Sequence, residues 1–198
     1  MTRWVEESAG GRDRGPVALG RAWVEVLVRP RRFFSTGVTP GDQAPGLVFA
    51  AAVVLIEEAT RFALVSGVFP TLGGRPLAAG LLALAASAVL IAPLALHLVA
   101  ALQTLLLIPF AAGRAGVSET VQVLAYAAAP CALAGAPIPA LRLACAGYGA
   151  ALLAVGVAQV HELSLPRAAA LAALPAALVF GYGFRGFAAA TALFGSLA

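Results

Sequence analysis

Between Arg75 and Arg114 the chain runs for 38 residues without a formally charged side chain. As a helix rising about 1.5 Å per residue, this run would be ~57 Å long, whereas the hydrocarbon core of a bilayer is about 30 Å thick. Hydrophobic residues make up 61% of the chain and charged residues 11%, a composition that suits burial in lipid better than a water-soluble core. The sequence therefore predicts an all-α, polytopic transmembrane helical bundle.

Five apolar segments, bounded by charged residues, glycines and prolines, follow the N-terminal region. They predict spans over residues 47–69, 77–109, 119–136, 141–160 and 167–194, the last interrupted by Pro175. Because 38 uncharged residues are too few for two spans and a turn, the second span should be one long helix, tilted or kinked at Pro93. Residues 44–198 are interpreted as one membrane domain of about five helices.

Residues 1–43 are interpreted as a cytoplasmic arm that contains an amphipathic helix. Apolar residues recur there at spacings of three and four, opposite arginines. A helix of this kind lies in the headgroup plane of the bilayer, and Pro30 should kink or end it. Each arginine near anionic lipid would contribute roughly 1 kcal/mol to binding. The predicted membrane-surface residues are Arg21, Trp23, Arg29, Arg31, Arg32, Phe33 and Phe34.

The distribution of arginine predicts the orientation. Seven of the chain's arginines precede residue 33, which favours a cytoplasmic N-terminus and, with five spans, an external C-terminus in the cell membrane. The net charge of +4 arises largely in this arm, where acidic residues are interspersed. The expected partners are therefore the lipid bilayer and its anionic headgroups rather than nucleic acid.

The first span is unusual because it carries Glu57, Glu58 and Arg61. A charge near the centre of a span costs about 2.5 to 3.5 kcal/mol, so these side chains need partners. Arg61 can pair with either glutamate on the same helix, at i,i+3 or i,i+4, and Arg185 on the last span lies at a similar predicted depth. A salt-bridge network between the two spans is favoured. An ion or proton pathway, a polar substrate site and interfacial snorkelling remain alternatives.

Other polar residues give weaker indications. His97 and Gln103 have no partner at metal-ligand spacing, so an interhelical hydrogen bond is expected for His97. His161 and Glu162 lack the second histidine of a zinc protease and are expected at a loop end on the cytoplasmic surface. We find no phosphate-binding loop and no Ser, His and Asp set in the sequence. The sequence predicts neither an enzyme nor a metal or cofactor site.

Cysteines and small residues indicate how the helices pack. Cys131 and Cys145 each lie seven positions from Ile138, so an antiparallel hairpin places them at equal depth. Two buried free thiols are favoured over a disulfide. Small residues at four-residue spacing allow close helix approach, within the molecule or between copies. They are Ala146, Ala150, Ala154 and Ala158 on the fourth span, and Gly186 and Ala190 on the fifth.

Residues 111–139 read AAGRAGVSETVQVLAYAAAPCALAGAPIP, a Gly-containing loop and polar turn followed by a span with Tyr126 four residues before Pro130. This stretch resembles the Yip1 domain family. The arm, with Arg29 and Pro30 before Phe33 and Phe34, is similar to the prokaryotic branch of that family, and residues 158–168 are similar to its loop before the last span. The resemblance implies five spans and a cytoplasmic N-terminus.

Eukaryotic members of the Yip1 family are associated with vesicle traffic, Rab GTPases and the organisation of membranes. Their Asp-Leu-x-Gly-Pro element before the first span is replaced here by ThrProGlyAspGlnAlaProGly at residues 39–46, so Rab binding is not carried over. The resemblance implies a membrane-organising or partner-binding scaffold, whose partner is an unidentified membrane or cytoplasmic protein or a second copy of the chain. The alternative is a small transporter or channel that uses Glu57, Glu58, Arg61 and Arg185.

Overall fold

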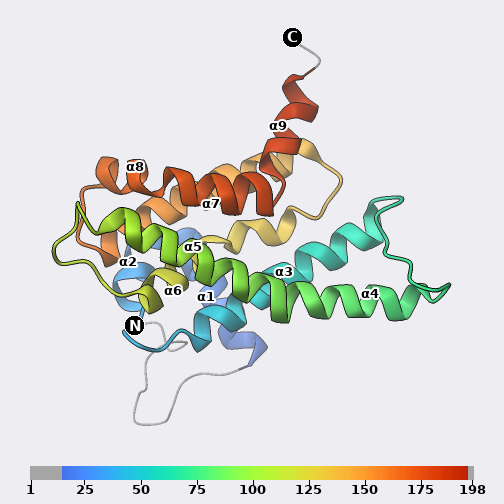
Figure 1. Ribbon diagram of the computed structural model, residues 1–198, viewed down its shortest axis with the longest axis horizontal. Helices are drawn as coiled ribbons and strands as arrows, with labels where there is room; N and C mark the ends of the chain where they lie inside the picture. The colour runs from blue at the N-terminus through green and yellow to red at the C-terminus, as the bar shows by residue number, and fades with distance from the viewer. Residues whose placement is uncertain (1–14, 196–198) are drawn as a thin grey trace.

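The computed structural model describes residues 15–195, and within that range all regular structure is helical, as predicted (Figure 1). The first half contains α1 (Pro16–Val28), α2 (Pro30–Thr36), α3 (Ala44–Leu64), α4 (Pro76–Ala85), the π-helical η1 (Ala86–Ile91) and α5 (Ala92–Leu107). The second half contains α6 (Val117–Ala127), the 3₁₀-helical η2 (Ala129–Leu133), α7 (Pro139–Val160), α8 (Leu165–Ala176), the π-helical η3 (Ala177–Gly183) and α9 (Gly186–Phe194). The first 14 residues of the predicted arm and the predicted external C-terminus lie outside the described residues.

Three helices of the described chain are long and apolar enough to cross a membrane: Pro76–Leu107, Pro139–Val160 and Leu165–Gly183. The predicted number of five spans is therefore not confirmed. The second span is one continuous helix of 32 residues, as predicted. Pro93 lacks an N–H group for the helical ladder, and the chain adapts just before it with the π-helical turn η1, where Ala92 donates to the carbonyl of Ser87.

The third predicted span, residues 119–136, is not among these three helices. α6 ends at Ala127, and Pro130 lies in the short 3₁₀ helix η2, because proline can neither donate to the helical ladder nor fit its ring against the preceding turn. Every residue from 120 to 132 is buried. The segment packs against α3, α5 and α7, so it forms the centre of the bundle.

The last predicted span is interrupted after Gly183 and not at Pro175, where the sequence predicted the interruption. The helix continues through Pro175 as η3 and ends at Gly183, after which α9 turns away at a steep angle (Figure 1). Pro175 cannot donate to the carbonyl of Leu171, and Nε2 of Gln103 on α5 donates to that carbonyl instead, at 3.2 Å. The interhelical bond from Gln103 therefore satisfies the polar group that the proline leaves open.

The described part of the arm packs onto the membrane domain and shares one hydrophobic core with it. Pro30 separates α1 from α2, as predicted. The headgroup location predicted for Phe33 and Phe34 is wrong, because both side chains are buried, Phe33 completely. Nε1 of Trp23 donates to the carbonyl of Ala129 in η2, at 2.9 Å, so this half-buried side chain also faces the protein.

Candidate functional site

Four charged side chains form a cluster between α3 and the start of α9; we call Glu57, Glu58, Arg61 and Arg185 the charge cluster. Arg61 donates to Oε2 of Glu58 from Nε at 3.0 Å and from Nη2 at 2.6 Å. Arg185 donates to Oε1 of Glu58 from Nη1 at 3.2 Å and from Nη2 at 3.1 Å, and Nη2 also pairs with Glu57. The structure thus brings together all four residues that the sequence singled out. Their formal charges sum to zero.

Arg185 reaches α3 because the helix breaks at that residue. Its φ of 60° places it in the left-handed region, which costs a residue with a Cβ atom about 1 to 2 kcal/mol. Gly186 permits the break, since an added Cβ atom would lie 2.7 Å from the carbonyl oxygen of Phe180 and 2.8 Å from Cβ of Ala146. The small residues Ala146 and Gly186 therefore serve intramolecular packing, and α9 begins in contact with α7.

The loop that precedes α7 packs against the backbone of Glu57. A Cβ atom added to Gly135 would lie 2.1 Å from the carbonyl oxygen of Glu57, so a glycine is required for this close approach. Arg142 secures the loop by donating to the carbonyls of Ala134, at 2.8 Å, and Ala136, at 3.2 Å. Sequence reasoning did not single out Arg142 for this role.

Two cysteines lie near this loop, as the hairpin predicted. Cys131 and Cys145 are both buried and free, and Sγ of Cys131 lies 3.8 Å from the carbonyl oxygen of Cys145. The prediction of two buried free thiols is confirmed, and the hairpin brings the two residues into contact.

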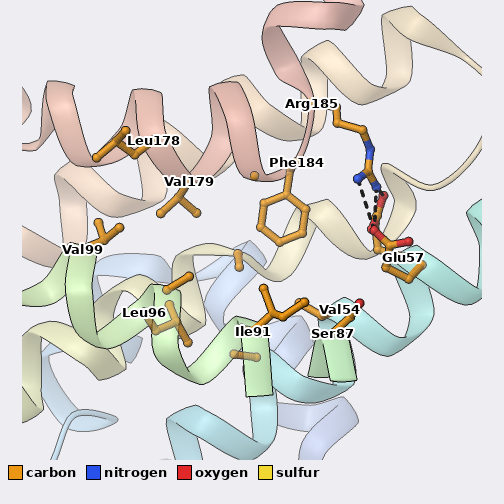
Figure 2. Close-up of a pocket in the computed structure, with 16 residues that line it drawn as sticks. Val54, Glu57, Ser87, Ile91, Leu96, Val99, Leu178, Val179, Phe184 and Arg185 are labelled. Atoms are coloured by element: carbon orange, nitrogen blue, oxygen red, sulfur yellow. Dashed lines mark hydrogen bonds and ion pairs between the residues drawn. The ribbon is translucent and has the colours of Figure 1, made fainter. Parts of the chain in front are cut away.

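A cavity of about 360 Å³ lies beside the charge cluster, between α3, the η1–α5 helix and η3. Figure 2 shows Leu178, Val179 and Phe184 along one side and Leu96 and Ile91 along the other, with Arg185 and Glu57 at one end. Both π-helices contribute to its walls. Because π-helical turns occur frequently at functional sites, this cavity and the charge cluster form the candidate site. Its walls are mostly apolar, so the sequence pattern alone could not reveal it.

A comparison with protein-family models matches residues 24–185 to the Yip1 domain. The chain belongs to the Yip1 domain family. The match begins within α1 and ends at Arg185, so it includes the last turn of α1, all of α2 and all four residues of the charge cluster. No curated protein matches the chain significantly, and neither does any solved structure. Together with the apolar helices, the family identifies a membrane protein of Yip1 type.

Tyr126 and Pro130 are the two residues on which the family resemblance rests, and both lie in the packed core of the domain. The ring of Tyr126 lies edge-on to Phe33, with centroids 4.8 Å apart, and to Phe49, at 5.2 Å. Phe49 in turn contacts Trp23, at 5.3 Å. This aromatic cluster joins α1, α2, α3 and α6, and Pro130 ends the central segment beneath it. Phe33 is buried because its ring completes this cluster.

Gln122 is a central polar residue that sequence reasoning missed. Its Oε1 accepts from the backbone N–H of Thr39 at 3.0 Å, and its Nε2 donates to the carbonyl of Thr39 at 2.7 Å. The amide thus pairs with a peptide group, as a neighbouring strand would, and fixes the α2–α3 connection to α6. An uncharged polar residue inside an apolar segment is the signal that could have indicated it.

The remaining predicted residues separate into surface and buried groups. Arg21, Arg29, Arg31 and Arg32 are all exposed, and their proposed contact with lipid headgroups remains a prediction. The interhelical bond expected for His97 is not found in the described chain, because its Nδ1 lies 2.7 Å from the carbonyl oxygen of Pro93 on the same helix. Among the described residues, no group of three His, Cys, Asp or Glu side chains could hold a metal ion.

His161 differs most from its predicted place. It is 1% exposed, at the end of α7, while Glu162 beside it is exposed. Its Nε2 lies 3.4 Å from Oγ1 of Thr120, and burial, with a smaller effect from Arg114, lowers its pKa to about 4. The imidazole is therefore neutral at physiological pH. The expected surface position is wrong because α6 and α7 pack over the ring.

Proposed function

We propose that this Yip1-type protein acts as a multi-pass scaffold of the cell membrane, which binds partners or organises lipid and catalyses no reaction. The observation that carries the proposal is the arrangement of α1 and α2. Phe33 and Phe34 are buried in the core and Trp23 is half-buried, while Arg29, Arg31 and Arg32 stay exposed. A short basic helix fixed to a membrane domain suits binding of an acidic protein surface or anionic headgroups, because little conformational entropy is lost on binding.

The orientation proposed for this scaffold has the basic segment on the cytoplasmic side. The arginine-rich N-terminal region favours that side. Single cysteines at exposed Arg31 and exposed Gly74, in a background with Cys131 and Cys145 replaced by alanine, test it with a membrane-impermeant maleimide. Labelling of position 74 in intact cells, and of position 31 only after permeabilisation, supports the orientation. The reverse pattern contradicts it.

Partner capture tests the scaffold itself. After gentle crosslinking in cells, the protein is purified in mild detergent and its companions are identified by mass spectrometry. A triple change of Arg29, Arg31 and Arg32 to glutamine should reduce capture, while a matched change of the exposed Arg75 and Arg114 should not. Equal capture by both variants, or recovery of the protein alone, would contradict a partner-binding role of the basic segment.

A small transporter or channel is the second candidate, because a cavity adjoins the charge cluster. All four charged side chains are engaged in ion pairs within the cluster, which supports a structural role for them over an ion pathway. Proton flux in proteoliposomes tests the alternative. Flux that vanishes in Glu57→Gln, while the variant remains folded, would favour transport over the scaffold.

A further inference from the structure

The cavity beside the charge cluster separates two helices that otherwise pack together. The membrane-length helices Pro76–Leu107 and Leu165–Gly183 contact each other through α5 and α8, whereas the cavity lies between η1 and η3. Ile91, which lines it, is 58% exposed, and Leu178 on the opposite side is also exposed. The mouth therefore lies between two apolar helices. In a membrane, such a mouth faces the hydrocarbon of the bilayer.

The charged end of the cavity lies close to the edge of that hydrocarbon layer. The helix Leu165–Gly183 has 19 residues and so a length of ~28 Å, which matches the thickness of a bilayer core. Arg185 follows two residues after its end, at the level where the ester and phosphate oxygens of lipids begin. From Arg185 the cavity continues toward Leu178 and Val99, which lie at its far end in Figure 2.

Arg185 also retains an unused donor. Within residues 15–195, its Nε–H is buried and makes no hydrogen bond, although both of its Nη atoms are engaged by Glu57 and Glu58. A buried donor without an acceptor is unfavourable, because it has lost its hydration and gained no hydrogen bond in return. An oxygen acceptor carried by a bound molecule would supply that hydrogen bond. Because the charge cluster is neutral overall, the acceptor need not carry a particular net charge.

We propose that the cavity binds one acyl chain of a membrane lipid, with an ester or phosphate oxygen near Nε of Arg185 and the chain directed toward Val99 and Leu178. The cavity volume of about 360 Å³ is near the lower limit of the ~300–1,000 Å³ of small-molecule sites, so a single slender chain fits better than a whole two-chain lipid. The proposal goes beyond the scaffold role and does not depend on the basic segment.

Photo-crosslinking in nanodiscs tests the proposal, with a phosphatidylcholine that carries a diazirine at the end of one acyl chain. The exposed residues Leu98 and Leu105 should be labelled by any surrounding lipid. Labelling of the buried Leu96 or the half-buried Val179 requires that a chain enters the cavity. Adducts on these inner residues are the expected result, and labelling confined to the outer residues overturns the proposal.

Two substitutions distinguish a filled cavity from a general loss of structure. Ala95 is exposed at the cavity mouth, and Ala95→Trp should reduce inner labelling about tenfold while outer labelling is unchanged. Ala101, exposed on the same helix but outside the cavity, provides the matched control Ala101→Trp. Inner labelling that survives Ala95→Trp, or falls equally in the control, overturns the proposal.

Arg185→Lys tests the polar end. Lysine keeps the positive charge beside Glu57 and Glu58 but lacks the Nε–H donor. Inner labelling should fall or shift to other cavity residues, in a variant whose thermal unfolding shows that it remains folded. If the variant is labelled at the same residues and with the same yield as the native protein, the assignment of the lipid oxygen to Arg185 is overturned.

Discussion

Replacing Arg185 with glutamine should destabilise the protein more than any other single change in the charge cluster. Glu58 would keep its ion pair with Arg61, but the side chain of Glu57, which is 3% exposed, would lose the cation that pairs with it. Removal of one partner of a buried pair costs about 3 to 5 kcal/mol, because the other charge stays buried without compensation. We expect Arg185→Gln to lose a free energy of unfolding in this range.

Glu57→Gln should cost less, about 1 to 2 kcal/mol, because Arg185 retains Glu58 as its partner. The double variant with Glu57→Gln and Arg185→Gln leaves only the neutral pair of Glu58 and Arg61. It should therefore be more stable than Arg185→Gln alone, by at least about 1 kcal/mol.

Unfolding by SDS in mixed micelles, followed by circular dichroism, measures these free energies. If the double variant loses the sum of the two single losses, Arg185 and Glu57 are not coupled and the reasoning is refuted. Arg61→Gln serves as a comparison, since Arg61 pairs with Glu58 on the same helix and its loss leaves Glu58 paired with Arg185, so it should contribute less, about 0.3 to 1 kcal/mol.

Three further predictions follow from contacts around the bundle. Gly135→Ala should cost about 1 to 3 kcal/mol of stability, because the new Cβ atom would lie 2.1 Å from the carbonyl oxygen of Glu57. The control Gly147→Ala has open space around it and should be neutral or gain up to ~1 kcal/mol. Equal effects of the two changes in thermal unfolding would contradict the close approach at Gly135. Gln103→Leu should cost about 1 kcal/mol by removing a donor that the proline-containing helix α8 needs, and an unchanged SDS midpoint would argue against that role. The pKa of His161 in the folded protein, about 4, lies below its ordinary value of 6.5, so the unfolded chain binds the proton more readily. The free energy of unfolding should therefore be highest above pH ~6.5 and fall by about 3 kcal/mol toward pH 4. A His161→Gln variant should lose that part of the pH dependence, and an unaltered pH profile would show that another group causes it.

The sequence predicted the charge cluster well because the spacing of Glu58 and Arg61 makes one ion pair local. Arg185 was assigned from a rough estimate of depth, which succeeded although the helix breaks immediately before it. The site of that break was not predictable from Pro175, since a helix can continue through a proline when another group satisfies the carbonyl that the proline leaves open. Gln103 provides that donor from a different helix.

The arm and the third segment were predicted less well, for a related reason. Phe33, Phe34 and Trp23 have the spacing of a lipid-facing stripe, but the same apolar face packs equally well against Tyr126 and the central segment. α6 ends at Ala127, and the carbonyl of Ala129 just beyond it accepts a hydrogen bond from Trp23. Neither feature is visible without knowing which helices are neighbours.

The sequence by itself determined the helices, their apolar character and the membership of the family, because helical hydrogen bonds are local and lipid requires a closed set of them. The tertiary structure decided which apolar residues face the core, which face lipid, and where a cavity remains between η1 and η3. Lipid chains are as apolar as leucine, so hydropathy does not distinguish the inside of such a bundle from its outside. That choice depends on how side-chain shapes and a few polar pairs, such as Gln122 with Thr39, fit when the helices meet.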